Sequence, residues 1–279
     1  MKADLHYHGL IGMHEPYLTK QGYTGKNLMG LALDCAAKRG IEMIGIVSEQ
    51  FEIPKYSEHD RFNYLLRETR KLPKEEYSHD KLGEKDIAFC VERKKDGKRL
   101  FVLNGQTVIV MDEGKRFDHL AIGSSQVPNK RSLKDTLNYC YDHGLISIAE
   151  HPFFQKHFGV GGKNLANFID CYDAIEGHNS QLIFAKKANK QAQEFAEKWG
   201  IPWVATSDAH RIEDVGISSI VLDSNMLNIS NERRLLKSLR TIVRTKSFRQ
   251  DVHYESIFGW FNWVGKFGMS EVRKRILGR

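Results

Sequence analysis

The sequence predicts an α/β fold, a barrel in which strands alternate with helices. Short β-branched or otherwise apolar runs, such as residues 41–48 and 145–150, are separated by segments of helical periodicity. Roughly seven or eight such strands over about 230 residues fit a closed barrel better than a doubly wound sheet. Polar residues that can bind metals follow several of these strands, and barrel enzymes carry their chemistry at the C-terminal strand ends.

Eight segments have the composition of buried strands. Continuous apolar runs are typical of strands that are covered on both faces, as in a parallel sheet. No glycine-rich phosphate loop follows the first run, so an open nucleotide-binding sheet has no support. The expected strands are residues 2–8, 41–48, 100–110, 119–123, 145–150, 174–176, 202–207 and 217–222.

Six segments read as helices between or after these strands. Gly40, Gly144 and Gly200 follow three of them and are suitable C-terminal stops. Ser132 and Asn231 are suitable N-caps. The expected helices are residues 26–39, 57–70, 132–142, 164–171, 181–199 and 231–245.

Two segments are expected to depart from the barrel. Residues 51–98 are charged and contain Pro54 and Pro73, which indicates an insertion with a short helix and a hairpin, of the kind that forms lids or binding surfaces. Residues 231–279 hold twelve Lys or Arg against four Asp or Glu, a net charge of +8 in a chain whose total is +7. We therefore expect a barrel over residues 1–230 and a basic helical extension over residues 231–279.

The end of the chain combines aromatic and basic side chains. Residues 254–269 are rich in Tyr, Phe and Trp, and residues 273–279 are rich in Lys and Arg. Such a segment can bind nucleic acid by base stacking and phosphate contacts, or lie at a membrane interface. It can equally pack against the barrel or form a dimer contact. The sequence leaves these alternatives and the oligomeric state open.

The composition is that of an ordinary globular protein. The chain has 279 residues, 41% hydrophobic and 28% charged, and it contains no apolar run of about 18 residues, the length of a membrane span. The N-terminus enters the first strand without an apolar leader, so we expect a cytoplasmic protein. Cys35, Cys90, Cys140 and Cys171 are scattered without CxxC spacing, which suits free thiols better than a zinc knuckle or disulfides.

Histidines and an aspartate gather at the ends of the expected strands. His6 and His8 are two residues apart, as are Asp208 and His210, so each pair projects from one side of an extended strand. His151 follows another strand in the same way. Because the strand ends of a barrel meet at one face, these residues predict a shared site for divalent metal ions. Imidazole and carboxylate ligands suit Zn, Mn or Fe.

Most of these histidines lie in four short motifs. They are Asp4-Leu5-His6-Tyr7-His8, His151-Pro152, Ile175-Glu176-Gly177-His178-Asn179 and Ser207-Asp208-Ala209-His210. In this order they resemble the PHP family, named for polymerase and histidinol phosphatase, and the resemblance spans most of residues 1–225. It implies a distorted barrel of seven β/α units that binds up to three metal ions and hydrolyses phosphate esters.

The resemblance also implies roles for individual residues. It assigns His6, His8 and Asp208 to one metal ion. It assigns His14 and His210 to a second ion, and His119 and His151 to a third. His178 is expected beside these ligands or on the substrate side. Lys20, Lys156 and Arg211 lie on loops that should face the mouth of the barrel, where they are suited to hold phosphate oxygens. Glu150 is expected to face away, because neighbours on a strand alternate.

Two positions depart from the family's pattern. The family has Thr-Asp-His after its second strand, where this chain has Ser48-Glu49-Gln50, and a Gly-x-Glu strand with a bridging Glu, where this chain has Gly105-Gln106. An amide oxygen is a neutral and poorer ligand than a carboxylate. With Glu49 as the substitute for the missing His, we expect one or two firmly bound metals and a third that is weak or absent.

Two hypotheses about function follow. The first is a metal-dependent hydrolase of phosphate esters that uses hydroxide formed at the metal. The basic tail favours a nucleic acid or nucleotide as its substrate, and hence a nuclease-like enzyme, over a small phosphomonoester. The second is a degenerate PHP barrel that serves as a nucleic-acid-binding or assembly module, which Gln50 and Gln106 favour.

Overall fold

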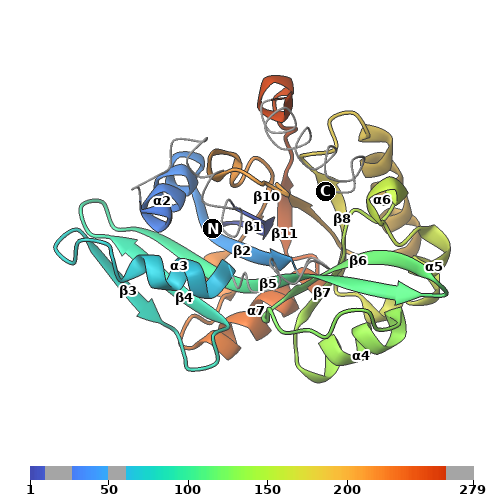
Figure 1. Cartoon of the computed structure of the whole chain (residues 1–279), viewed down its shortest axis with the longest axis horizontal. Helices are drawn as coiled ribbons and strands as arrows, with labels where there is room; N and C mark the ends of the chain where they lie inside the picture. The colour runs from blue at the N-terminus through green and yellow to red at the C-terminus, as the bar shows by residue number, and fades with distance from the viewer. Residues whose placement is uncertain (10–26, 50–60, 262–279) are drawn as a thin grey trace, which may run out of the picture.

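One mixed β-sheet forms the centre of the computed structural model, which describes residues 1–9, 27–49 and 61–261 (Figure 1). Nine strands follow one another along this sheet, in the order β11-β10-β1-β2-β5-β6-β7-β8-β9. Their bounds are β1 (Lys2–Tyr7), β2 (Ile41–Glu49), β5 (Lys98–Asp112), β6 (Lys115–Ile122), β7 (Ile146–Ala149), β8 (Ala174–Asn179), β9 (Trp203–Thr206), β10 (Ser219–Leu222) and β11 (Phe248–Asp251).

The sheet curls into a nearly closed barrel. Strand β9 lies against β1, β10 and β11 at the other end of the path. The segment after β9 continues this contact: the amide of Asp208 donates to the carbonyl of His6 at 2.8 Å, and Ala209 forms an isolated parallel bridge with Tyr7. This mixed α/β barrel confirms the expected fold class, and its mouth lies where the C-terminal ends of β1 and β9 meet.

Strands β5 and β6 form an antiparallel hairpin, which differs from the expected parallel pairing. Asp112 pairs with Lys115, and only Glu113 and Gly114 lie between them. Both of these residues have positive φ, 47° and 75°, as a two-residue hairpin turn of type I′ requires. The two strands extend to this turn, beyond residue 110 of the first expected strand and before residue 119 of the second.

Helices cover the outside of the barrel and begin and end close to the expected positions. Asn27, Ser132 and Asn231 cap three of them, each with a side-chain oxygen that accepts a backbone N–H. Gly40 ends the first in a left-handed conformation, φ 69°. The α-helices are α2 (Leu28–Arg39), α3 (Arg61–Thr69), α4 (Leu133–Asp142), α5 (Gly162–Asn167), α6 (Lys186–Trp199) and α7 (Glu232–Arg244). The short 3-10 helices are η2 (Gln155–His157), η3 (Ile169–Cys171), η4 (Ile212–Asp214) and η5 (Ser224–Met226).

The segment after residue 60 belongs to the core, although an excursion was expected for residues 51–98. Its hairpin, β3 (Tyr77–Lys81) and β4 (Ala88–Arg93), extends the main sheet because β4 pairs with β5. Phe62 and Leu65 of α3 are fully buried in one apolar cluster with helix α2 and strand β4. In the part that the structure describes, the expected insertion is therefore continuous with the barrel.

Helix α7 is also part of the core, not an appendage. Its residues Leu235 and Leu239 are fully buried in the apolar cluster that fills the barrel, together with Leu5 and Leu120. In Figure 1 the helix lies beneath the central strands, and β11 then joins the sheet beside β10. The boundary expected at residue 230 consequently falls inside one packed unit.

The remaining general expectations concern cysteines and membranes. The structure has four free cysteines, as predicted: Cys35, Cys90, Cys140 and Cys171. Among residues 1–9, 27–49 and 61–261, no helix is long and apolar enough to cross a membrane. Most of the aromatic and basic tail, residues 262–279, lies outside the described part of the chain.

Candidate metal centre

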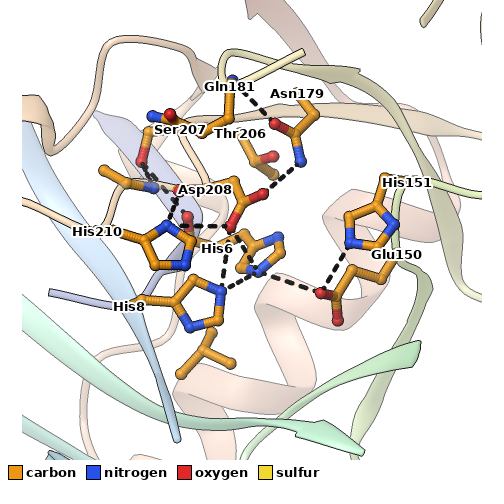
Figure 2. Close-up of polar contacts among 12 residues, drawn as sticks. His6, His8, Glu150, His151, Asn179, Gln181, Thr206, Ser207, Asp208 and His210 are labelled. Atoms are coloured by element: carbon orange, nitrogen blue, oxygen red, sulfur yellow. Dashed lines mark hydrogen bonds and ion pairs between the residues drawn. The ribbon is translucent and has the colours of Figure 1, made fainter. Parts of the chain in front are cut away.

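The first strand carries two histidines to one point at the barrel mouth. The pairing of β1 with β2 shifts register between Asp4 and Tyr7. His6 and His8 are both buried, and their Nε2 atoms lie 2.9 Å apart (Figure 2). Asp4 accepts instead from the amides of Ser207 at 3.1 Å and Gly216 at 2.9 Å, so it ties β1 to the segment after β9.

The segment after β9 adds a carboxylate and a third imidazole. Oδ1 of Asp208 lies 3.1 Å from Nε2 of His8 and 3.4 Å from Nε2 of His6. The ring of His210 stacks on that of His8, with centroids 4.5 Å apart. Asp208 has a φ of 49°, which is strained for a non-glycine residue and is typical of functional sites.

Glu150 and His151 complete the site from the opposite side of the mouth. Oε1 of Glu150 lies 3.2 Å from Nε2 of His151 and 3.6 Å from Nε2 of His6. The expectation that Glu150 faces away is wrong, because β7 ends at Ala149 and the alternation of a strand does not extend past its end. His151 itself has a φ of 26°.

These residues form three overlapping groups of possible metal ligands. In each group, one donor atom per residue lies within 4.8 Å of the others. The groups are His6, His8 and Glu150, then His8, Asp208 and His210, then Asp118, Glu150 and His151. His8 and Glu150 each belong to two groups, as residues between neighbouring metals do.

The chemistry of these groups fits divalent cations. Imidazole nitrogen with carboxylate oxygen is the ligand set of Zn, Mn and Fe sites. Oε2 of Glu150 and Nδ1 of His151 are buried, and neither has a hydrogen-bond partner among the described residues. Buried polar atoms without partners are rare and call for a ligand.

A second layer of side chains orients the first. Oε1 of Glu176 accepts from Nδ1 of His6 at 2.7 Å and also from the hydroxyl of Thr206. Its other oxygen accepts from the amide of His151 at 2.7 Å. The amide of Asn179 donates to Oδ2 of Asp208 at 2.9 Å. Carboxylates behind ligating histidines fix the ring and strengthen the ligand. Glu176 and Asn179 lie in the third sequence motif, but no pattern in that motif indicates these roles.

The electrostatics of the cluster favour bound cations. Burial alone lowers the pKa of His6, but the carboxylates of Asp208 and Glu176 outweigh it and hold this pKa well above its usual range. Burial also lowers the pKa of His151, but the hydrogen bond and the charge of Glu150 outweigh it and raise this pKa to about 9. Burial and the neighbouring carboxylate of Glu150 raise the pKa of Asp118 to about 7. When no metal is bound, these carboxylates therefore keep protons on the neighbouring side chains of His6, His151 and Asp118.

We expect the affinity for divalent metals to rise with pH up to about 9, the pKa of His151. Protons held on His6 and His151 must leave before their nitrogens can bind a metal, so binding releases protons and weakens as the pH falls. Calorimetric titrations with Zn²⁺ at pH 7 and pH 9, in buffers of different ionisation enthalpy, measure both the affinity and the protons released. An affinity that does not change with pH contradicts this expectation.

His119 lies apart from the cluster, although the resemblance implies that it is a ligand. Its Nε2 lies 3.2 Å from the hydroxyl of Ser147 and 3.7 Å from the sulfur of Cys140. Burial lowers its pKa to about 4. Because neighbours on β6 point to opposite faces, Asp118 takes the inward position, where Arg116 holds its Oδ1 at 3.0 Å.

Replacing His119 by Gln is expected to leave the metal content unchanged, since its ring is directed away from the ligand groups. Stability should fall by about 1–2 kcal/mol, because buried hydrogen-bonding groups lose their partner. Asp118→Asn, on the same strand, is expected to lower the metal content. Elemental analysis and thermal melting of both variants test this pair, and a loss of metal in His119→Gln alone argues against it.

Gln106 also faces away from the mouth. Its amide accepts from Val127 N at 2.8 Å and donates to Val127 O at 2.9 Å, so it anchors the loop after β6. The placement of Gln106 at a ligand position is therefore wrong. Thr107, one residue later, pairs with Leu120 of the barrel interior, and its buried hydroxyl has no hydrogen-bond partner in the described structure.

Other expected site residues are elsewhere or cannot be placed. Nε2 of His178 lies 2.9 Å from the carbonyl of His253, and its ring lies against Tyr254, so it joins β8 to the C-terminal segment. Arg211 is held by both oxygens of Asp214, at 2.5 and 2.6 Å, and lines a cavity of about 600 Å³ with Lys2 and Arg39. Lys156 is exposed in η2. His14, Lys20, Gln50 and the side chain of Glu49 lie outside the described residues.

Two solved structures share this fold. The crystal structure of PsfC from Pseudomonas syringae PB-5123 superposes with a TM-score of 0.58 at 13% identity, covering 99% of this chain and 98% of that one. A two-domain protein from Bacteroides vulgatus ATCC 8482, which contains a predicted PHP-like metal-dependent phosphoesterase, superposes with a TM-score of 0.55 at 15% identity. That match covers 91% of this chain and 65% of that one. No curated protein matches the sequence.

The fold and the cluster define a barrel protein whose mouth carries three groups of side chains that could hold metal ions. Residues 186–241 match the family model described as PHP-associated, over a segment that includes Asp208 and His210. This match agrees with the resemblance to the PHP family that the four sequence motifs indicated.

Proposed function

We propose that the protein is a metal-dependent phosphoesterase. The observation that carries the proposal is the set of three overlapping ligand groups, which share His8 and Glu150 at the mouth of the barrel. Adjacent cations of this kind can hold both the attacking and the leaving oxygen of a phosphoryl group. The PHP-like phosphoesterase contained in the Bacteroides protein supports the same class of reaction. One to three ions of Zn, Mn or Fe are proposed.

The chain's own residues prepare this reaction by holding the ligands in place. Divalent cations supply Lewis-acid activation of water and neutralise charge that builds on the phosphoryl oxygens. Glu176 keeps His6 oriented through its Nδ1, and Asn179 keeps one oxygen of Asp208 engaged so that the other faces the imidazoles. Arg116 lies beside Asp118 and places a guanidinium at the edge of the cluster, where it can hold a phosphate oxygen.

Hydrolysis assays with defined metals test the proposal. Protein stripped with chelator and reloaded with Zn²⁺, Mn²⁺ or Fe²⁺ is offered bis-p-nitrophenyl phosphate as a diester and p-nitrophenyl phosphate as a monoester. Metal-dependent turnover of at least one substrate is expected. A protein that binds no metal and turns over neither substrate refutes the proposal. Oligonucleotide binding by such a protein, with strong salt dependence, then identifies the degenerate binding module.

We further propose a nucleic acid or nucleotide as the substrate. The net charge of +8 over residues 231–279 supports this choice, since phosphate-rich ligands are attracted to basic segments. Diester hydrolysis should exceed monoester hydrolysis. Neutralising the tail in Arg273→Gln, Lys274→Gln and Arg275→Gln together should weaken oligonucleotide binding and reduce its salt dependence. Lys94→Gln, Lys95→Gln and Lys98→Gln together form the matched control, and equal effects of the two triple variants contradict the proposal.

A further inference from the structure

A buried arginine lies against the metal centre. Arg61, the first residue of α3, is 2% exposed. Its Nη1 lies 2.8 Å from Nδ1 of His8, 3.1 Å from the carbonyl of His8 and 2.7 Å from the carbonyl of Val47. Its backbone amide donates to the hydroxyl of Ser48 at 3.1 Å, which fixes the start of the helix beside β2. The guanidinium is thus built into the site.

This contact decides which nitrogen of His8 carries the proton. A guanidinium nitrogen is always protonated and cannot accept a hydrogen bond. Nδ1 of His8 must therefore accept, and neutral His8 carries its hydrogen on Nε2. That N–H points toward Nε2 of His6, 2.9 Å away, and Oδ1 of Asp208, 3.1 Å away. The lone pair on Nδ1 of His8 accordingly points to Arg61, and no lone pair of this ring points to the space between the ligands.

His6 has the opposite arrangement. Its Nδ1 donates to Oε1 of Glu176 at 2.7 Å, which leaves the lone pair on Nε2 facing the cluster. A carboxylate behind the imidazole is the usual arrangement for a ligating histidine. Glu176, His6, His8 and Arg61 thus lie on one continuous chain of hydrogen bonds.

We propose that Arg61 is a positioning residue that makes the metal positions unequal, by weakening metal binding at the two ligand groups that contain His8. A metal at Nε2 of His8 needs the proton on Nδ1, where it meets a guanidinium that cannot accept it. The group of Asp118, Glu150 and His151 lacks this conflict and is the tighter site. The inference rests on the proposed function, because it concerns the order in which the same centre takes up its metals.

Metal titrations of matched variants test the role of Arg61. Arg61→Gln removes the charge and offers an amide oxygen that can accept from Nδ1, whereas Arg61→Lys keeps a charged donor. Arg67→Gln changes an exposed arginine of the same helix. With Zn²⁺ as the probe, the weaker sites of Arg61→Gln should bind at least about tenfold more tightly, in the range that residues behind metal ligands control. The wild type, Arg61→Lys and Arg67→Gln should bind alike.

The protonation of His6 and His8 can also be measured in the wild type, so that the test does not depend on whether the variants fold. In ¹⁵N NMR spectra of the metal-free protein, His8 should be protonated at Nε2 and unprotonated at Nδ1, and His6 the reverse. A His8 protonated at Nδ1, or an Arg61→Gln variant that binds Zn²⁺ no more tightly than the wild type, overturns the inference. If the wild type nevertheless binds metal and hydrolyses phosphodiesters, only the role of Arg61 fails. If neither protein binds Zn²⁺, the proposed function fails with it.

Discussion

Replacing Asp208 by Asn is expected to remove activity and the metal bound by the ligand group of His8, Asp208 and His210. Its Oδ1 lies 3.1 Å from His8 and 3.4 Å from His6, and the residue belongs to a ligand group with His210. An amide keeps the shape but not the charge that offsets the cations. Because metal ions contribute several kcal/mol to transition-state stabilisation, we expect kcat/KM to fall by roughly 10³-fold or more, equivalent to about 4 kcal/mol.

Diester hydrolysis and elemental analysis measure these two effects on one preparation. Asp142→Asn, an exposed aspartate at the end of α4, is the matched control and should behave as the wild type. A fully active Asp208→Asn variant with its metal content intact is the result that would remove Asp208 from the centre.

Replacing Glu150 by Gln is expected to have the second largest effect. Glu150 belongs to two of the three ligand groups, and its Oε1 lies 3.2 Å from His151. Without its charge, neighbouring cations repel each other without compensation, so the protein should bind fewer ions. We expect a loss of roughly 10²-fold to 10³-fold in kcat/KM, in line with the loss of a charge that stabilises the transition state.

The metal stoichiometry distinguishes this effect from a general loss of folding. Glu194→Gln, on the exposed face of α6, is the control, and its thermal melting and metal content should match those of the wild type. Removing Glu150 should also lower the pKa of His151, because Glu150 is what raises it. Full metal occupancy in Glu150→Gln contradicts the assignment.

Much of the fold was predictable because local signals agree with the tertiary structure. The caps Ser132 and Asn231 and the stop at Gly40 mark helix ends by hydrogen bonding that is local in sequence. The packing of these helices is not local. The apolar spacing of α7 predicts a helix, but no pattern in it indicates that the helix packs against the barrel core and does not form an extension.

The residues of the candidate site were predictable where they follow the end of a strand. They were not predictable where the register of a strand decides which side chains point into the barrel. His6, His8, His151, Asp208 and His210 all reach the mouth because strand ends converge there. The choice between Asp118 and His119 depends on which face of β6 points inward, and the hairpin turn after Asp112 sets this. A shift by one residue exchanges the two faces of a strand. Gln106 was misplaced for the same reason.

The link between Asp4 and the Ser207 amide, 203 positions apart, has a consequence for synthesis. During synthesis, β1 is made long before its neighbour β10 and the carboxylate of Asp208. Until then, the nascent polypeptide has two early histidines but not the partners that shape them into a site. Metal binding at His6 and His8 is therefore expected to follow the synthesis of Asp208.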